Sequence, residues 1–563
     1  MKWNIKKAIS RKELGYLVST LGIPPIIANI LLDRNINSEE QIRSFFKSHW
    51  SDSYDPYLLK GMDTAVKRII KAVQEKEKIF IYGDYDVDGI TSVSLLKIFL
   101  DRLGGDVHFY IPDRLTEGYG LSDSGISKAA EKNATLLITV DCGIKGVDEI
   151  NKARDIGVDT IICDHHEPGA VLPPAIAILN PKQKGCTYPF KELAGVGVAF
   201  KLVQGVSKYL NLKEEYSKQY LDLVALGTAA DIVPLVDENR LFVKEGLKSI
   251  NRAERVGVRC LIKTAGLTGR RISTGQIVFM LAPRLNAAGR VGSAERGVRL
   301  LITENEQQAA NLAQILESEN RVRKNIDEKT FNEAREMLEA VYDVQEDRIV
   351  VLAKEGWHPG VIGIVASRIS EEINRPVVMI SIEDSVGKGS ARSIKEFDMY
   401  SALSLCKKNL IQFGGHKYAA GLTIDEVKID EFREQLKAIS LDMISDDALV
   451  KTINIDMQIS LSDIDDSLVT YLKLFEPYGP KNMRPVFMSQ NLQVIGTPRI
   501  VGNNHLKFKV RENNKIFDAI GFNLGDLMYR LSPGENNLDM VYIIEENYWN
   551  GKTQTQLRVK DIK

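Results

Sequence analysis

Three short apolar runs in the first half of the chain each lead into acidic residues or histidines. The runs and their polar partners are 79–82 with Asp84, Asp86 and Asp88; 136–140 with Asp141; and 160–163 with Asp164, His165 and His166. Such runs, alternating with helical segments, predict strands of a parallel sheet, and ligands bind at the carboxyl ends of parallel strands. The pattern therefore predicts an α/β fold whose acidic residues and histidines meet at one edge of the sheet.

Carboxylates and imidazoles gathered at one place are typical ligands of divalent metal ions. Helix capping alone explains the three aspartates poorly, because like charges so close together repel one another without a counter-cation. Mixed oxygen and nitrogen ligands favour Mn²⁺, with Mg²⁺ as an alternative and Zn²⁺ less suited in the absence of thiolates. Two such ions about 3.5–4 Å apart would suit the hydrolysis of a phosphate ester.

A calcium loop is the main rival interpretation of the first motif. The segment that begins at Asp84 matches the start of an EF-hand loop, which must close with a bidentate glutamate. The residue at the closing position is Leu95. A strand-like run, rather than a helix, precedes Asp84, so the sequence favours the Mn²⁺ or Mg²⁺ site.

The rest of the chain divides by pattern into several parts. Its 563 residues exceed what one hydrophobic core supports. Residues 304–341 contain no Gly or Pro and predict a long bridging helix. A second α/β pattern runs to about residue 450, and the short alternating segments of 451–563 predict a small β-barrel or sandwich.

Composition limits location and partners. The net charge of −1 creates no overall field for a polyanion, although a local basic groove could still bind nucleic acid. The five cysteines show neither a disulfide pattern nor a thiolate zinc site. No apolar stretch reaches the roughly 18 residues of a membrane span, and the N-terminus lacks a signal-peptide core. We therefore expect a cytoplasmic protein without a membrane partner.

The motifs resemble those of the DHH phosphoesterase superfamily and, within it, those of the RecJ single-strand-specific exonucleases. The matching segments, in family order, are 83–91, 140–143, 164–166 (the eponymous Asp-His-His), 225–235, 282–290, 356–366, 389–393 and 414–416. The resemblance implies two α/β domains, joined by a long helix, and a C-terminal OB-fold barrel. The expected boundaries are an N-terminal helical segment (1–60), a DHH domain (61–303), a connecting helix (304–345), a DHH-associated substrate-binding domain (346–450) and an OB-fold nucleic-acid-binding domain (451–563).

The resemblance also implies roles for individual residues of the metal site. The expected metal ligands are Asp86, Asp88, Asp141, His165 and Asp231. Asp84 and His166 complete the expected catalytic set. The local pattern around Asp231 alone would have indicated only a loop or cap residue. Tyr82 stands where the family often has a histidine.

Substrate-binding residues are expected in three regions. Arg284, Asn286 and Arg290, in a predicted turn-rich segment, suit a phosphate clamp. By resemblance, Ser390 and Arg392 with Arg114 would bind a terminal 5′-phosphate, and Gly414, Gly415 and His416 would contact the substrate near the cleaved phosphate. In the tail, Lys507, Phe508 and Lys509 could bind single strands, although Phe508 could equally be a core residue.

The implied activity is that of a 5′→3′ exonuclease with two Mn²⁺ or Mg²⁺ ions. It would degrade single-stranded DNA from a 5′ end to nucleoside 5′-monophosphates, in DNA repair and recombination. A single-strand-binding protein and a helicase are expected partners. Two alternatives stay open: a DHH-type phosphodiesterase on short oligonucleotides or cyclic dinucleotides, and a non-catalytic single-strand-binding protein.

Overall fold

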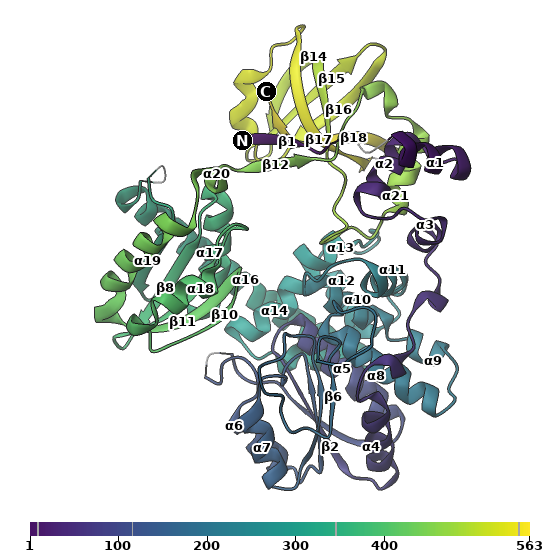
Figure 1. Ribbon diagram of the computed structural model, residues 1–563, viewed down its shortest axis with the longest axis vertical. Helices are drawn as coiled ribbons and strands as arrows, with labels where there is room; N and C mark the ends of the chain where they lie inside the picture. Colours follow the sequence, from purple (N-terminus) through teal and green to yellow (C-terminus); the bar gives the residue numbers. More distant parts are fainter. Residues whose placement is uncertain (8–10, 115, 344–345, 550–551) are drawn as a thin grey trace. The chain divides into compact units, whose positions relative to one another are not determined.

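The computed structural model describes residues 1–7, 11–114, 116–343, 346–549 and 552–563, and these form two compact units (Figure 1). The larger unit comprises Tyr54–Val233 and Glu238–Lys451. The smaller unit comprises Met1–Ser53, Pro234–Asp237 and Thr452–Lys563. The first and last segments of the chain therefore fold together. None of the helices in the described part is both long and apolar enough to cross a bilayer.

A parallel sheet of five strands organises the first part of the larger unit. Its order is β3-β2-β4-β5-β6. The strands are β2 (Lys78–Gly83), β3 (Asp106–Tyr110), β4 (Leu136–Val140), β5 (Asp159–Cys163) and β6 (Ala177–Leu179). All residues of β4 are buried, as expected for a continuous apolar run in a sheet covered on both faces. The predicted parallel sheet is confirmed.

Helices cover both faces of this sheet (Figure 1). On one face, α6 (Asp123–Glu131) and α7 (Val147–Asp155) pack on a core that includes Phe80 and Leu137. On the other face, α8 (Gly195–Tyr209) contacts both α4 (Met62–Gln74) and α5 (Val87–Arg102), and all three helices contact the strands. Further helices follow: α10 (Leu221–Ala230), α11 (Asp237–Arg252), α12 (Val256–Thr264), α14 (Ala282–Val291) and α15 (Glu295–Ile302).

The predicted long helix is α16 (Glu306–Val341). It begins where the side chain of Asn305 accepts a hydrogen bond from the backbone N–H of Gln308. Along its length it contacts α12, α14 and α15 of the first part and α17 (Pro359–Ile373) of the second. Residues 344–345, at the expected end of the connecting segment, lie outside the described residues.

The second part of the larger unit is a mixed sheet with the order β10-β11-β9-β8-β7. Its strands are β7 (Val350–Glu355), β8 (Val377–Glu383), β9 (Val386–Arg392), β10 (Gln412–His416) and β11 (Ala419–Asp425). Strands β7 and β8 are parallel, and the other neighbours are antiparallel. Helices α16 and α17 share a core with one face, and α18 (Met399–Leu405) and α19 (Ile429–Met443) with the other.

A closed barrel forms the centre of the smaller unit. Its strands are β14 (Phe487–Val501), β15 (His505–Glu512), β16 (Lys515–Gly521), β17 (Asn536–Trp549) and β18 (Lys552–Ile562). Pairing of β14 with β17 closes it. The sequence predicted two short strands at 486–488 and 492–495, whereas β14 is one long strand with register shifts near Leu492. The predicted β-barrel is confirmed.

The N-terminal segment packs on this barrel. The sequence predicted a helical segment here. The segment instead begins with a strand, β1 (Lys2–Ile5), which pairs with β12 (Thr452–Ile455). Helices α1 (Arg11–Leu21), α2 (Pro25–Asp33) and α3 (Glu39–Phe46) contribute apolar residues to the barrel core. Contacts between such distant segments leave no local sequence pattern that could have predicted them.

Candidate metal centre

The predicted acidic residues and histidines converge at the carboxyl ends of β2, β4 and β5. Potential ligand atoms lie within 4.8 Å of one another in three sets: Asp84–Asp86–Asp141, Asp88–His165–Asp231 and Asp141–His165–His166. All seven residues of the expected catalytic set are therefore together. We call Asp84, Asp86, Asp88, Asp141, His165 and Asp231 the acidic centre.

The first turn of α5 orients Asp86. This residue caps the helix, because its Oδ1 accepts hydrogen bonds from the backbone N–H groups of Asp88 (2.9 Å) and Gly89 (3.1 Å). The N–H of Val87 donates to Asn286 Oδ1 at 3.1 Å. Capping thus occupies one oxygen of Asp86 and leaves Oδ2 outside the cap.

Asp88 is held by the N-terminus of α8. Its two carboxylate oxygens accept hydrogen bonds from the N–H groups of Gly195 (2.6 Å) and Val196 (2.8 Å). Each oxygen keeps a second lone pair, so Asp88 can also bind a cation. Burial and the charge of Asp86 raise the pKa of Asp88 to about 7. The two amides were not found from the sequence, because backbone donors carry no residue signature.

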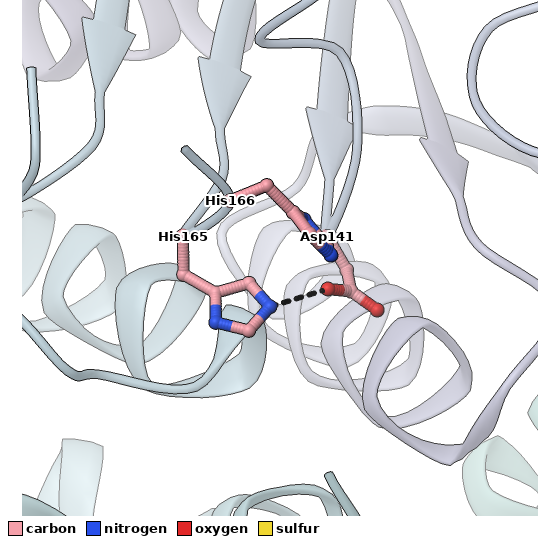
Figure 2. Close-up of side chains that lie close together, drawn as sticks. All are labelled: Asp141, His165 and His166. Carbon is pink, nitrogen blue, oxygen red and sulfur yellow. Dashed lines mark ion pairs between the residues drawn. The ribbon is translucent and has the colours of Figure 1, made fainter. Parts of the chain in front are cut away.

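The backbone at Asp141 is strained. Its φ of +59° lies in the left-handed region, where non-glycine residues cost roughly 1–3 kcal/mol and often mark functional sites. In this conformation Asp141 Oδ1 lies 3.2 Å from His165 Nε2, as Figure 2 shows. The same nitrogen is 3.7 Å from Asp231 Oδ2. The strained turn thus brings β4 and β5 ligands to the end of α10.

Several buried ligand atoms of the centre have no hydrogen-bond partner among the described residues. They are Asp84 Oδ1, His165 Nε2 and Asp231 Oδ2. Buried polar atoms are normally hydrogen-bonded, so this set calls for another partner. Burial and neighbouring carboxylates raise the pKa of Asp84 and of Asp141. Burial lowers the pKa of His165 to about 3, so the ring is neutral and able to coordinate. A divalent cation fits these donors.

His166 is oriented by Asp164. Its Nδ1 lies 2.7 Å from Asp164 Oδ1, and Tyr119 Oη lies 2.9 Å from its Nε2. Burial lowers the pKa of His166, but the hydrogen bond to Asp164 and the negative charges of Asp164, Asp84 and Asp86 together raise the pKa overall. Asp164 also accepts the backbone N–H of Ile144 at 2.9 Å. The sequence placed Asp164 in the motif but did not predict that it positions His166.

An arginine cluster belongs to the same unit. Arg114, Arg290 and Arg392 make it up, and within the described part of the chain none of them forms an ion pair. Burial lowers the pKa of Arg290 to about 9, and the charges of Arg114, Arg323 and Arg392 contribute. Arg290 still stays charged at neutral pH. Cations that repel one another at a partly buried site favour binding of an anion.

The structure corrects the secondary structure expected around Arg284 and Asn286. Their segment is not turn-rich but helix α14, with Pro283 in its first turn and alanines that favour a helix. Arg284 is buried and its Nε lies 2.7 Å from Glu317 Oε2 on α16, so it joins two helices rather than clamping a phosphate. Asn286 caps α5.

Strand register shows which residues of the second sheet share a face with Arg392. Arg392 is opposite Ala419, which is opposite His416; Ser390, Gly421 and Gly414 form the adjacent row. Side chains alternate along strands, so Ser390, Arg392, Gly414 and His416 lie on one face and Gly415 on the other. A Cβ on Gly415 would lie 2.4 Å from Ala419 O, so the β10–β11 hairpin requires a glycine at this position.

The barrel residues differ partly from expectation. Phe508 is only 3% exposed and lies in the barrel core, so its ring is not available to stack on a base. Lys507 instead belongs to an outward row across four strands: Arg499, Lys507, Ile520 and Arg558. Lys509 Nζ lies 3.9 Å from Asp518 Oδ1. Phe522, which is 43% exposed, packs under Arg558.

Family models match three segments of the chain. They describe the DHH family N-terminal domain (78–228), the DHHA1 domain (346–440) and the RecJ OB domain (455–561). The single-stranded-DNA-specific exonuclease RecJ of Bacillus subtilis is 39% identical, over 100% of this chain and 70% of that protein. The chain belongs to the RecJ family. RecJ of Escherichia coli is 32% identical over 96% of both chains.

Solved RecJ structures have the same fold. RecJ of Thermus thermophilus in complex with Mn²⁺ matches with a TM-score of 0.85 and 29% identity, over 100% of this chain and 79% of that one. A second exonuclease RecJ, bound to manganese, matches with a TM-score of 0.60 and 37% identity, over 68% of this chain and 95% of that one. Members of the family thus carry manganese on this fold.

Proposed function

We propose that this chain is a metal-dependent 5′→3′ exonuclease that degrades single-stranded DNA to nucleoside 5′-monophosphates. The observation that carries the proposal is the acidic centre, in which three buried ligand atoms, Asp84 Oδ1, His165 Nε2 and Asp231 Oδ2, lack hydrogen-bond partners among the described residues. RecJ relatives named as single-stranded-DNA-specific exonucleases support the substrate. Repair and recombination of DNA would be the setting of this activity.

Two Mn²⁺ or Mg²⁺ ions are proposed as cofactors. Asp84, Asp86 and Asp141 would hold one, and Asp88, His165 and Asp231 the other. When bound, such ions activate water and neutralise charge that develops on the phosphoryl group. Hydrolysis at such a site requires no side chain that forms a covalent intermediate with the phosphate. His166, kept in place by Asp164, is proposed to lie against the scissile phosphate.

The arginine cluster is the proposed site for the terminal 5′-phosphate. Arg392 Nη1 lies 3.0 Å from Ser390 Oγ, so both can turn to one phosphate, and Arg114 adds charge. His416 and Gly414 share the face of Ser390 and Arg392 and are proposed to contact the substrate backbone. A site for the chain end explains polarity, because the end fixes which phosphodiester meets the metal ions.

The barrel is proposed to bind single strands farther from the cleaved end. Arg499, Lys507 and Arg558 supply positive charge and Phe522 an exposed ring, whereas Phe508 is excluded by its burial. We also propose the domain boundaries expected from the sequence, with residues 1–53 assigned to the barrel unit. A helicase and a single-strand-binding protein are proposed partners, and the cytoplasm the proposed location.

One digestion experiment tests the activity and its polarity. Oligonucleotides labelled at the 5′ or the 3′ end, single- or double-stranded, are incubated with Mn²⁺ or with EDTA. We expect labelled mononucleotide to appear at once from the 5′ label, only on single strands and only with metal. Release from the 3′ label first would contradict the proposed polarity. Preference for dinucleotides over long strands would favour the short-substrate phosphodiesterase, and undigested single strands a binding protein.

A further inference from the structure

Ile232 directly follows the proposed ligand Asp231 and has an unfavourable backbone conformation. Its φ is +62°, in the left-handed region. A β-branched residue there is a genuine outlier, because its Cβ substituents clash with the backbone. Among the described non-glycine residues with positive φ, Ile232 is the one with a β-branched side chain. The strain therefore calls for an explanation.

The end of α10 explains the conformation but not the residue. The N–H of Asp231 donates to Gly227 O at 2.9 Å, and the next residue turns the chain out of the helix. Helices commonly end with a left-handed residue at this position, usually glycine and sometimes asparagine. Either would end the helix at lower cost than isoleucine.

Packing within the protein does not explain the side chain either. Ile232 is 64% exposed, whereas Leu235, close behind it in the chain, is 2% exposed. An isoleucine that stabilised a core would be buried. Among the described residues, burial of the Ile232 side chain therefore does not offset the cost of the left-handed conformation.

We propose that the Ile232 side chain is a nonpolar contact for the nucleotide whose phosphate lies at the acidic centre. Consecutive Cα atoms are about 3.8 Å apart, so Ile232 is one residue from a carboxylate oriented toward His165. An exposed aliphatic group there can pack on the sugar and base beside the scissile phosphate. Such a contact reads no base identity, which suits a nuclease that accepts any sequence. The inference rests on the proposed nuclease function.

Replacement of the side chain separates this contact from a structural role. Ile232→Asn removes the apolar surface and keeps a residue that tolerates positive φ. We expect kcat/KM on 5′-phosphorylated single strands to fall about tenfold. The midpoint of thermal unfolding should be no lower than that of the parent, and the affinity for Mn²⁺ should change less than about twofold. Ile232→Val should keep most of the activity.

The matched control is Val427→Asn. Val427 is also β-branched and is 88% exposed, but it lies in the short 3₁₀ helix Glu426–Lys428, which has no proposed contact with substrate. We expect this variant to match the parent in activity. A loss equal to that of Ile232→Asn would show that exposed apolar residues matter in general, and it would overturn the specific contact.

Substrates without a base give the sharpest test. Oligonucleotides that lack the base of the first or of the second nucleotide are compared with the intact strand. If Ile232 packs on one of these bases, the parent should favour the intact strand, and Ile232→Asn should discriminate less. Unchanged kcat/KM, unchanged discrimination, weakened Mn²⁺ binding or a lower unfolding midpoint would each overturn the proposal. A parent without nuclease activity would overturn the proposed function as well, whereas an unaffected Ile232→Asn in an active parent would overturn this contact alone.

Discussion

The acidic centre and the arginine cluster are opposite in charge, but each gathers like charges at a buried or partly buried site. In the acidic centre, burial and neighbouring carboxylates raise the pKa of Asp141. In the arginine cluster, burial and neighbouring cations lower the pKa of Arg290. Groups of one sign that are buried together destabilise a fold unless a ligand of the other sign joins them. The acidic centre is therefore suited to cations and the arginine cluster to an anion, the charges of metal ions and of a phosphate.

The largest effect is expected from removing one charge of the acidic centre. Asp141→Asn keeps the size of the side chain but removes a charge from the centre. We expect hydrolysis of single-stranded DNA to fall roughly 100- to 1000-fold or more, because stabilisation of the transition-state charge is lost. Binding of single strands should persist in a filter or anisotropy assay. Glu131→Gln, on the exposed end of α6, is the control and should behave as the parent; retained turnover in Asp141→Asn would argue against the ligand assignment.

The second effect contrasts a paired arginine with the unpaired cluster. Arg284→Met removes the cation at Glu317 Oε2 and leaves Glu317 with the exposed Arg321, 3.1 Å from its Oε1, so the loss should cost roughly 1.5–3 kcal/mol of unfolding free energy. Chemical denaturation measures it. Preference for 5′-phosphorylated ends should stay, because the Arg284 guanidinium pairs with Glu317 inside the protein and does not contact the substrate. If stability held and end preference fell, Arg284 would belong with the substrate-binding arginines.

The third effect removes a member of the arginine cluster. Arg392→Ala should lower the preference for 5′-phosphate over 5′-hydroxyl ends roughly tenfold, the range of a charge-assisted hydrogen bond. Competition between the two substrates measures the ratio. Arg321→Ala, whose parent side chain is 75% exposed on α16, serves as control. Equal losses on both substrates would count against an end-binding site.

The smallest effect is a pH dependence of the metal-free protein. Asp88 has a pKa of about 7 in the fold, against about 3.9 when unfolded. A raised pKa in the folded state stabilises at low pH, and this contribution is lost as pH rises from about 4 to about 7. The rise in unfolding temperature caused by Mn²⁺ should therefore grow between about pH 5 and pH 7.5. Asp88→Asn should flatten this trend, and a constant increment in the parent would contradict it.

Sequence patterns predicted the strands and most of the acidic centre because both depend on residues that are close together in the sequence. Apolar runs mark the strands, and residues after parallel strands must share an edge. Asp231 was expected only through family resemblance, since it comes from the end of a helix that the strand rule does not cover. Asp164 and the amides that hold Asp88 appear only once the chain is folded.

The differences between the expected and the observed surroundings of Arg284 and Phe508 have one physical source. Arg284 and Phe508 have the chemistry of a phosphate clamp and of a base-stacking ring, but burial decides their use, and burial depends on distant segments. Glu317, which pairs with Arg284, lies on another helix. Phe508 faces inward because alternation along β15 places it opposite to Lys507. Residue type alone could not separate such internal roles from contacts with substrate.

Anomalous scattering from crystals soaked in Mn²⁺ tests the central claim most directly. We predict two manganese peaks about 3.5–4 Å apart. One should lie within bonding distance of Asp84, Asp86 and Asp141, and the other of Asp88, His165 and Asp231. A fully soaked crystal with no peak among these residues, or with manganese bound elsewhere, would contradict the account.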